Sequence, residues 1–194
     1  MGKIFYLMGK SSTGKDTIFN MLKEKYPDMR TIVLYTTRPI REGELDGREY
    51  FFVNEDQLAE LEAAGRVIEL RAYQTMHGVW KYFTVDDGQV DLERYSYLVI
   101  GTLESYARMC DYYSAEGLVP IYIEVEDGER LTRALARERN QKCPKYSEMC
   151  RRFLADAIDF SDENLQQCGI SRRFFNHHMD ACFREINLYI KENL

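Results

Sequence analysis

The sequence predicts an α/β fold in which helices cover a central parallel sheet. Ile4 to Met8 form a short apolar run that enters a glycine-containing turn, and a helix-compatible stretch at 17–25 follows at once. Two later segments, 97–100 and 118–125, are also apolar, and the second alternates as a core strand does. Helical periodicity occupies 103–113 between them. Strands and helices that take turns along the chain are typical of α/β domains.

The turn after the first strand has the form G-x-x-x-x-G-K, which is typical of phosphate-binding loops. Its glycines let successive backbone N–H groups point inward, and the helix that follows adds the positive end of its dipole. Lys15 is expected to reach the outer phosphates as a point charge. The alternative is a plain strand-to-helix turn with an exposed lysine. The candidate nucleotide-binding residues are Gly9, Ser11, Ser12, Thr13, Gly14, Lys15, Asp16 and Thr17.

Asp16 departs from the loop pattern. Where such loops carry a serine or threonine hydroxyl for Mg²⁺, this chain has a carboxylate, and Thr17 comes one residue later. The carboxylate could ligate Mg²⁺, repel the nucleotide or simply favour the start of the helix. Asp16 is therefore a candidate metal ligand, with these three interpretations open.

Composition and charge fit one globular domain. The chain has 194 residues, of which 45% are hydrophobic and 30% charged. Its net charge of −6 argues against a general nucleic-acid or membrane-surface binder. Because the first strand begins almost at once and no apolar run approaches a membrane span, we expect a cytoplasmic protein without a signal peptide. The five cysteines lack C-x-x-C spacing, so we expect reduced thiols and no zinc site.

The next segments predict a strand and a long polar loop. Pro27 ends the first helix, and 31–35 is rich in β-branched and apolar residues, as a second strand would be. The loop at 36–50 carries three arginines, two glycines and a proline. A loop of this length inside a domain is usually functional, although its composition alone favours a solvated charged loop.

The same loop carries a family resemblance. Thr36-Thr37-Arg38, then Arg41, Gly43-Glu44, Gly47 and the run Tyr50 to Val53 resemble the acceptor-nucleotide segment of guanylate kinases. Later segments fall in the family's order over nearly the full length. The resemblance implies a three-layer P-loop fold around a central parallel sheet, with a small mixed α/β acceptor-binding subdomain and an arginine-rich lid. Within a single domain at 1–194, the core is expected at about 1–35 and 96–194, the subdomain at 36–85 and the lid at 137–150.

The resemblance also implies roles for particular residues. Arg38, Arg41 and Tyr50 would hold the phosphate of a nucleoside monophosphate, which suits two guanidinium groups and a phenol. Glu69 would accept hydrogen bonds from N1–H and the exocyclic amine of guanine; the alternative is a surface carboxylate at a strand end. Further candidates by resemblance are Tyr82 and Thr84 for the substrate, Arg133, Arg137 and Arg152 in the lid, and Asn176 near the donor adenine.

Departures from the family pattern lie around the acceptor base. Leu34 stands where the family has a serine, and Ile100 and Thr102 stand where it has two aspartates. Those aspartates help to organise metal-bound water and contact guanine, so the base and the magnesium arrangement are both open.

The remaining elements follow from local pattern. We expect a helix at 55–64, a strand at 67–72, a turn at 86–88, a closing strand at 172–175 and a last helix from Met179. From Asp127, a helix should present Arg130, Arg133 and Arg137 as one stripe and Leu131, Ala134 and Leu135 on the other face. A long amphipathic helix is predicted at 146–165. His177 and His178 are expected to cap or to lie on the surface rather than to bind metal.

The resulting prediction is a kinase that transfers the γ-phosphoryl group of Mg-ATP to GMP, giving GDP and ADP. Positioning and charge neutralisation would carry the rate, and the ionised acceptor phosphate needs no general base. Two alternatives remain: another acceptor, such as a different nucleotide or a sugar phosphate, and a binding module without catalysis. The expected partners are nucleotide substrates, with no nucleic acid and no membrane, in a monomer or homodimer.

Overall fold

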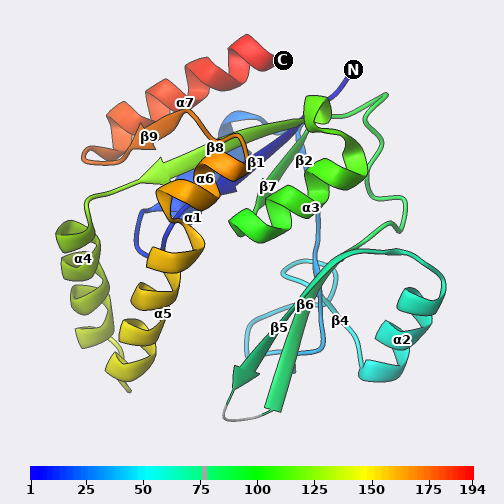
Figure 1. Cartoon of the computed structure of the whole chain (residues 1–194), viewed down its shortest axis with the longest axis horizontal. Helices are drawn as coiled ribbons and strands as arrows, with labels where there is room; N and C mark the ends of the chain where they lie inside the picture. The colour runs from blue at the N-terminus through cyan, green and yellow to red at the C-terminus, as the bar shows by residue number, and fades with distance from the viewer. Residues whose placement is uncertain (76–77) are drawn as a thin grey trace.

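The centre of the protein is a five-stranded parallel sheet with strand order β2-β7-β1-β8-β9. The computed structural model describes residues 1–75 and 78–194 (Figure 1). The sheet strands are β1 (Ile4–Met8), β2 (Arg30–Thr31), β7 (Tyr97–Ile100), β8 (Leu118–Glu124) and β9 (Arg173–Phe175).

Helices cover both faces of this sheet, as the apolar content of its strands requires. Along β1, Ile4, Tyr6 and Met8 pack on one face, while Phe5 and Leu7 pack on the other. The first face is covered by α3 (Leu103–Tyr113) and α6 (Asp162–Gln167), and the second by α1 (Lys15–Lys25) and α7 (Met179–Asn193). The predicted α/β fold with three layers is therefore confirmed.

A second sheet forms a small lobe, defined here as residues 35–85. Its strand order is β4-β3-β6-β5, and both β3 and β5 run antiparallel to β6. The lobe has its own apolar cluster around Leu58, Phe83 and Val85, and a capping box at Asn54 begins its helix. Its elements are β3 (Tyr35–Thr36), β4 (Phe51–Phe52), α2 (Glu55–Ala63), β5 (Val67–Thr75) and β6 (Gly78–Val85).

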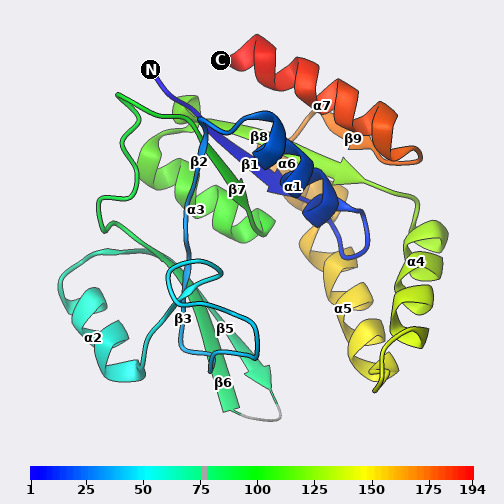
Figure 2. The same ribbon diagram turned by 180° about the vertical axis from the view of Figure 1, so that it is seen from behind.

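Two helices form a hairpin opposite the small lobe. They are α4 (Asp127–Arg139) and α5 (Tyr146–Asp159), and no residue of α5 is buried. The hairpin and the small lobe extend from the same side of the central sheet, with the loop between β1 and α1 close to the hairpin (Figures 1 and 2). The 3₁₀ turn η1 (Ala115–Gly117) completes the described elements. None of the helices in 1–75 and 78–194 is long and apolar enough to cross a membrane.

Most predicted elements are present, but the second strand was predicted wrongly. Residues 31–35 do not form one strand: β2 belongs to the central sheet and β3 to the small lobe. Between them, the side chain of Gln89 forms two hydrogen bonds with the backbone of Val33. Its Oε1 accepts from the Val33 N–H at 2.8 Å, and its Nε2 donates to the Val33 carbonyl at 3.1 Å. A side chain thus replaces the ladder at the point where the chain changes sheets.

The long helix predicted at 146–165 was also wrong, because it divides into α5 and α6. Ser161 accepts a hydrogen bond from the Asn164 N–H and so caps a new helix. Phe160 turns inward and stacks on Tyr122 with ring centroids 5.6 Å apart. The apolar face expected along this helix does not reach the core, since Leu154 is 65% exposed and only Leu165, in α6, is fully buried.

Candidate phosphoryl-transfer site

The loop between β1 and α1 depends on glycines at two positions. At Gly9, a Cβ atom would lie 2.4 Å from the Ile123 carbonyl oxygen, so only glycine permits this approach to β8. Gly14 has φ +85° and a Cβ there would lie 2.6 Å from the amide nitrogen of Asn176. Ser12 also adopts a positive φ of 65°, and its buried hydroxyl has no hydrogen-bond partner within residues 1–75 and 78–194. The backbone therefore has the curled form that the loop pattern predicted.

Lys15 is the first residue of α1 and lies half-buried at the end of this loop. Burial lowers the pKa of its ammonium group, while the carboxylates of Asp16 and Asp156 act in the opposite direction. Within the described part of the chain, Lys15 forms no ion pair within 4.0 Å. Its charge is thus available to an anion at the loop.

The loop opens into a pocket of about 420 Å³. Asp16 and Thr17 line it from the first turn of α1, and both are exposed. The remaining lining residues are Ser12, Gly14, Arg133, Arg137, Asn176 and Met179. The pocket therefore brings together most of the residues predicted for the nucleotide. An exposed carboxylate beside an exposed hydroxyl fits a Mg²⁺ ion held mainly by nucleotide phosphates, because such ions take only one or two protein ligands.

Asn176 fixes the loop from the end of β9. Its side-chain amide, 1% exposed as a residue, donates to the Thr13 carbonyl at 2.7 Å. The Thr13 hydroxyl in turn donates to the Lys10 carbonyl at 2.9 Å and does not face the pocket. Both residues therefore hold the loop shape through their side chains.

A buried arginine, absent from the predicted site, holds the loop from the other side. Arg130 is fully buried; its guanidinium donates to the Ser11 carbonyl at 3.1 Å and contacts the Asp156 carboxylate at 3.3 Å. That same carboxylate accepts from the Ser11 N–H at 2.6 Å, and Asp127 takes two further donors of Arg130. Ser11 is thus clamped through both its N–H and its carbonyl.

This clamp corrects the predicted arginine stripe. Arg130 does not share an outward face with Arg133 and Arg137, and Leu131, expected on the inner face, is 40% exposed. Asp127 and Asp156 supply the carboxylates that a buried guanidinium needs, so Arg130 can point toward the loop.

Two of the predicted lid arginines donate hydrogen bonds to residues of the loop or its pocket. Arg152 donates to the Ser11 hydroxyl at 3.2 Å. Arg133 pairs with Glu129 and donates to the Asn176 carbonyl at 2.9 Å. Arg137 lines the pocket, as Arg133 does. All three arginines therefore lie around the candidate donor site.

In the small lobe, the predicted phosphate-binding residues are only partly assembled. Arg38, 3% exposed, forms a two-pronged pair with Glu44 at 2.9 and 3.0 Å, and its Nε has no partner among the described residues. Tyr50 lies 5.6 Å from this guanidinium and 5.6 Å from the ring of Tyr82. Burial raises the pKa of Tyr50, so its phenol stays a hydrogen-bond donor. Arg41 is exposed, and its guanidinium lies 6.0 Å from the Trp80 ring.

The predicted base-reading residue, Glu69, is enclosed by other side chains. Thr84 donates to one of its oxygens at 2.7 Å. Arg71 donates to both oxygens, at 2.9 and 3.2 Å, and also to the Thr102 hydroxyl at 3.2 Å. The alternative of a surface carboxylate is therefore wrong, since Glu69 is 5% exposed.

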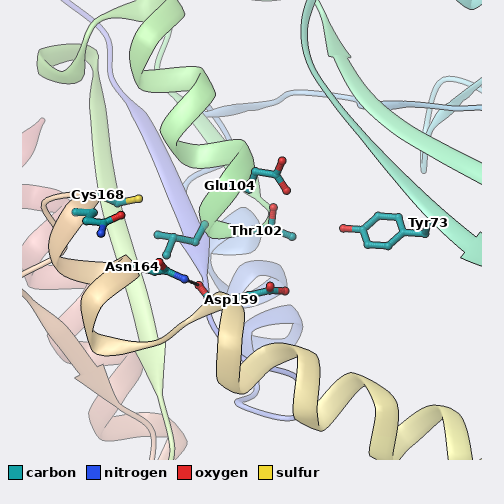
Figure 3. Close-up of a pocket in the computed structure, with 8 residues that line it drawn as sticks. Tyr73, Thr102, Glu104, Asp159, Asn164 and Cys168 are labelled. Carbon is teal, nitrogen blue, oxygen red and sulfur yellow. Dashed lines mark hydrogen bonds between the residues drawn. The ribbon is translucent and has the colours of Figure 1, made fainter.

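A second pocket, of about 200 Å³, adjoins this group. Tyr73 faces Thr102 across it, and Glu104 and Asp159 contribute carboxylates (Figure 3). Leu103, Asn164, Gln167 and Cys168 complete its lining. Thr102 belongs to both the pocket and the Arg71 group, and it caps α3 by accepting from the Ser105 N–H.

Leu34 and Ile100 bring no polar side chain to the base end. Leu34 uses its backbone carbonyl to accept from the Phe51 N–H, and Ile100 packs against the apolar cluster on the α1 and α7 face of the central sheet. The histidines form no metal site among the described residues; His177 lies 3.5 Å from Glu129.

Sequence reasoning did not single out Arg71 or Asp156. Each had a signal in the chain. Arg71 lies two residues after Glu69, which puts both side chains on the same face of a strand. Asp156 lies four residues after Arg152, which puts both on the same side of a helix. Without knowledge of which faces turn toward the loops, neither spacing distinguishes a site residue from a solvent-exposed one.

Comparisons with known proteins agree with this geometry. Residues 1–82 match the family model described as guanylate kinase. A guanylate kinase of Rhodopseudomonas palustris is 43% identical over 68 residues, which are 35% of this chain and 31% of that protein. One of Prochlorococcus marinus is 40% identical over 68 residues, 35% of this chain and 36% of that protein. The match thus spans about a third of the length of these relatives.

The similarity of fold extends much further than the similarity of sequence. The crystal structure of guanylate kinase from Anaplasma phagocytophilum superposes with a TM-score of 0.67, at 20% identity, over 98% of this chain and 85% of that one. The first 82 residues are thus similar in sequence to guanylate kinases, and the whole chain is similar in fold to a solved one.

Proposed function

We propose that the protein transfers the γ-phosphoryl group of Mg-ATP to the phosphate of a nucleoside monophosphate, with GMP as the acceptor. The observation that carries this proposal is the pairing of two anion sites on one side of the central sheet. One is the curled loop with Lys15, which has no ion-pair partner among the described residues, and the other is Arg38 with Tyr50 and Tyr82.

The donor end supplies positive charge and fixed amides. Arg133 and Arg137 line the loop pocket, and Lys15 follows the lining residue Gly14 in the chain, so the triphosphate of ATP would meet up to three cations there. Mg²⁺, when bound, would neutralise charge that develops between the phosphates, and Asp16, which lines the pocket, is the carboxylate that would hold it. Arg152, held at Ser11, lies beside the same loop.

The acceptor end supplies a guanidinium and two phenols. Arg38 holds its charge in a buried position, and Tyr50 keeps its proton because burial raises its pKa. A monophosphate there would accept from Arg38 and from the phenol of Tyr50 and face the loop pocket. Because phosphoryl transfer needs little covalent chemistry, positioning and charge neutralisation would carry the rate.

The test is a coupled assay of ADP release with the purified chain, ATP and Mg²⁺. We expect turnover with GMP and not with ATP alone. A chain that binds ATP without turning over any phosphomonoester would be a binding module, and a chain that binds no ATP in the presence of Mg²⁺ would contradict the donor site itself.

A second candidate is the same transfer to another phosphomonoester. It is favoured by the enclosure of Glu69, whose two oxygens already accept from Arg71 and Thr84. Assays with AMP, pyrimidine nucleotides and sugar phosphates beside GMP separate the two candidates. The cytoplasmic location and the monomer or homodimer state stay predictions.

A further inference from the structure

Arg71 stands at the end of the acceptor site where the resemblance expects a base. It lies on β5 opposite Tyr82 of β6, and Tyr82 contacts Tyr50 at the phosphate end. The Thr102 hydroxyl, at the edge of the second pocket, accepts one of its donors (Figure 3 shows Thr102). Arg71 therefore lies between Tyr82, at the phosphate end, and Thr102, at the edge of that pocket.

Glu69 is poorly placed to read donors of a ligand. Its carboxylate accepts three hydrogen bonds from Arg71 and Thr84, and a carboxylate has about four acceptor positions. Its side chain is 1% exposed, against 8% for Arg71. A guanine presented by N1–H and the exocyclic amine would need two acceptor positions and access to both oxygens.

Arg71, by contrast, keeps donors available. A guanidinium has five N–H groups. Among the described residues, the Nε–H and one N–H of each terminal nitrogen have partners, so one N–H remains on each terminal nitrogen. Two such donors match the O6 and N7 acceptors of a 6-oxopurine, the geometry by which arginine reads guanine in DNA.

No other polar side chain at the positions where the family pattern departs competes for this role. Ile100 is apolar, Leu34 uses only its backbone, and Thr102 already serves Arg71 and the start of α3. The charge of Arg71 is balanced by Glu69, so an uncharged base edge can approach it without bringing a counterion.

We propose that Arg71 is the specificity-determining residue of the acceptor site and reads the O6 and N7 edge of a 6-oxopurine monophosphate, with Glu69 as the positioning residue that holds it. This inference rests on the proposed kinase function. It predicts that the 2-amino group of guanine goes unread, so IMP and GMP are equivalent acceptors. AMP is rejected, because its 6-amino group is a hydrogen-bond donor and would face an N–H donor of Arg71.

The experiment compares kcat/KM for GMP, IMP, AMP and 7-deaza-GMP in the ADP-release assay. We expect GMP and IMP within about threefold of each other, since no contact distinguishes them. AMP and 7-deaza-GMP should be roughly tenfold or more poorer, because each loses part of the two-pronged contact. A GMP preference over IMP above about tenfold would overturn the proposal.

Variants assign the contact to its residue. Arg71→Lys keeps the charge without the fork, and should lower kcat/KM for GMP and IMP alike by about tenfold to a hundredfold, mainly through KM. Glu69→Gln should lower both in parallel, leave their ratio unchanged and act mainly through KM, whereas a loss of folding alone would lower kcat and leave KM unchanged. Arg94→Lys, in the exposed pair with Asp91, is the matched control and should change neither. If Glu69→Gln changes the ratio of kcat/KM for GMP to that for IMP, and Arg71→Lys changes neither value, then Glu69 contacts the base and the proposal is wrong.

A direct binding measurement separates this inference from the proposed function. If the chain turns over no purine monophosphate, the kinase proposal fails, and calorimetry with GMP and IMP decides the acceptor proposal. The acceptor proposal would be supported if GMP and IMP have similar dissociation constants and Arg71→Lys raises both. Absence of binding by either nucleotide, or binding unaffected by Arg71→Lys, would overturn it.

Discussion

The two ends of the proposed site treat their positive charges differently. At the donor end, Lys15 has no ion-pair partner among the described residues, and the loop is held by Arg130, Asp156 and Asn176 around it. At the acceptor end, each arginine forms an ion pair: Arg38 with Glu44, and Arg71 with Glu69. The donor end is thus ready for an anion, whereas the acceptor end holds its arginines in place by internal pairing.

Each end reaches a fixed geometry in a different way. A phosphate loop is positioned by its backbone, so its lysine can stay unpaired. An arginine on a strand or in a long loop has many rotamers, and a two-pronged carboxylate restricts them at the cost of partly neutralising the charge.

The largest effect is expected from Lys15→Ala. Removing the unpaired cation from the preorganised loop should lower kcat/KM by about 10²- to 10³-fold, by analogy with the loss of one preorganised donor. Circular dichroism should show the fold unchanged. Lys23→Ala, on the exposed side of the same helix, is the control. Activity that survives in Lys15→Ala would mean that the donor end does not use its unpaired charge.

Asp156→Asn tests the clamp on the loop. It leaves the buried Arg130 with Asp127 as its remaining carboxylate, and breaking a buried pair costs about 3 kcal/mol of unfolding free energy. Urea unfolding measures this. Asp159→Asn, an exposed carboxylate on the same helix, should stay within about 0.5 kcal/mol of the parent. If the two changes lower the free energy of unfolding equally, the contacts of Asp156 with Arg130 and Ser11 do not stabilise the fold.

Arg38→Lys probes internal pairing at the acceptor end. A lysine cannot make the two-pronged contact with Glu44, so we expect KM for the acceptor to rise about tenfold to a hundredfold while KM for ATP stays unchanged. Initial rates with each substrate varied in turn give both constants. Arg48→Lys, an exposed arginine in the same loop, is the matched variant. A rise in KM for ATP instead would mean that the two ends are not separate.

The smallest effect concerns pH. Hydrogen bonds from Arg38 lower the pKa of Glu44 below its ordinary value of 4.5. Because the folded-state pKa is the lower one, the pair stabilises the fold fully above that ordinary value, and the contribution is lost as pH falls through the lowered pKa. Thermal unfolding between pH 3 and pH 7 should therefore show a steeper acid loss in the parent than in Glu44→Gln. Parallel curves would show that the pair contributes nothing measurable.

The sequence was most informative where backbone pattern decides structure. The strand at 4–8, the glycine loop and the helix at 103–113 were all predictable, because apolar alternation and glycine positions are local properties. The split of 31–35 was not, since it depends on Gln89, which is distant in sequence and supplies hydrogen bonds to Val33. The break at Phe160 depends likewise on packing against Tyr122.

In the site, residue types were predictable but their partners were not. The resemblance pointed to Arg38 and Glu69, yet Arg71 enclosed Glu69 from the same strand face, and a sequence does not show which of two neighbours a carboxylate prefers. Arg130 was placed with the outward arginines because spacing describes a helix face without saying where that face points. The roles of Arg133, Arg137 and Asp16 stay predictions.

The clamp at Ser11 also limits how the helical hairpin can move. The side chains of Arg130, on α4, and Asp156, on α5, both form hydrogen bonds with Ser11. The Arg130 guanidinium also lies 4.4 Å from the centre of the Phe153 ring, which belongs to α5. A rigid swing of the whole hairpin would tear these contacts apart and distort the loop with them. Any bending of the hairpin is therefore expected toward its far tip, around residues 140–145, while the end at Ser11 stays in place.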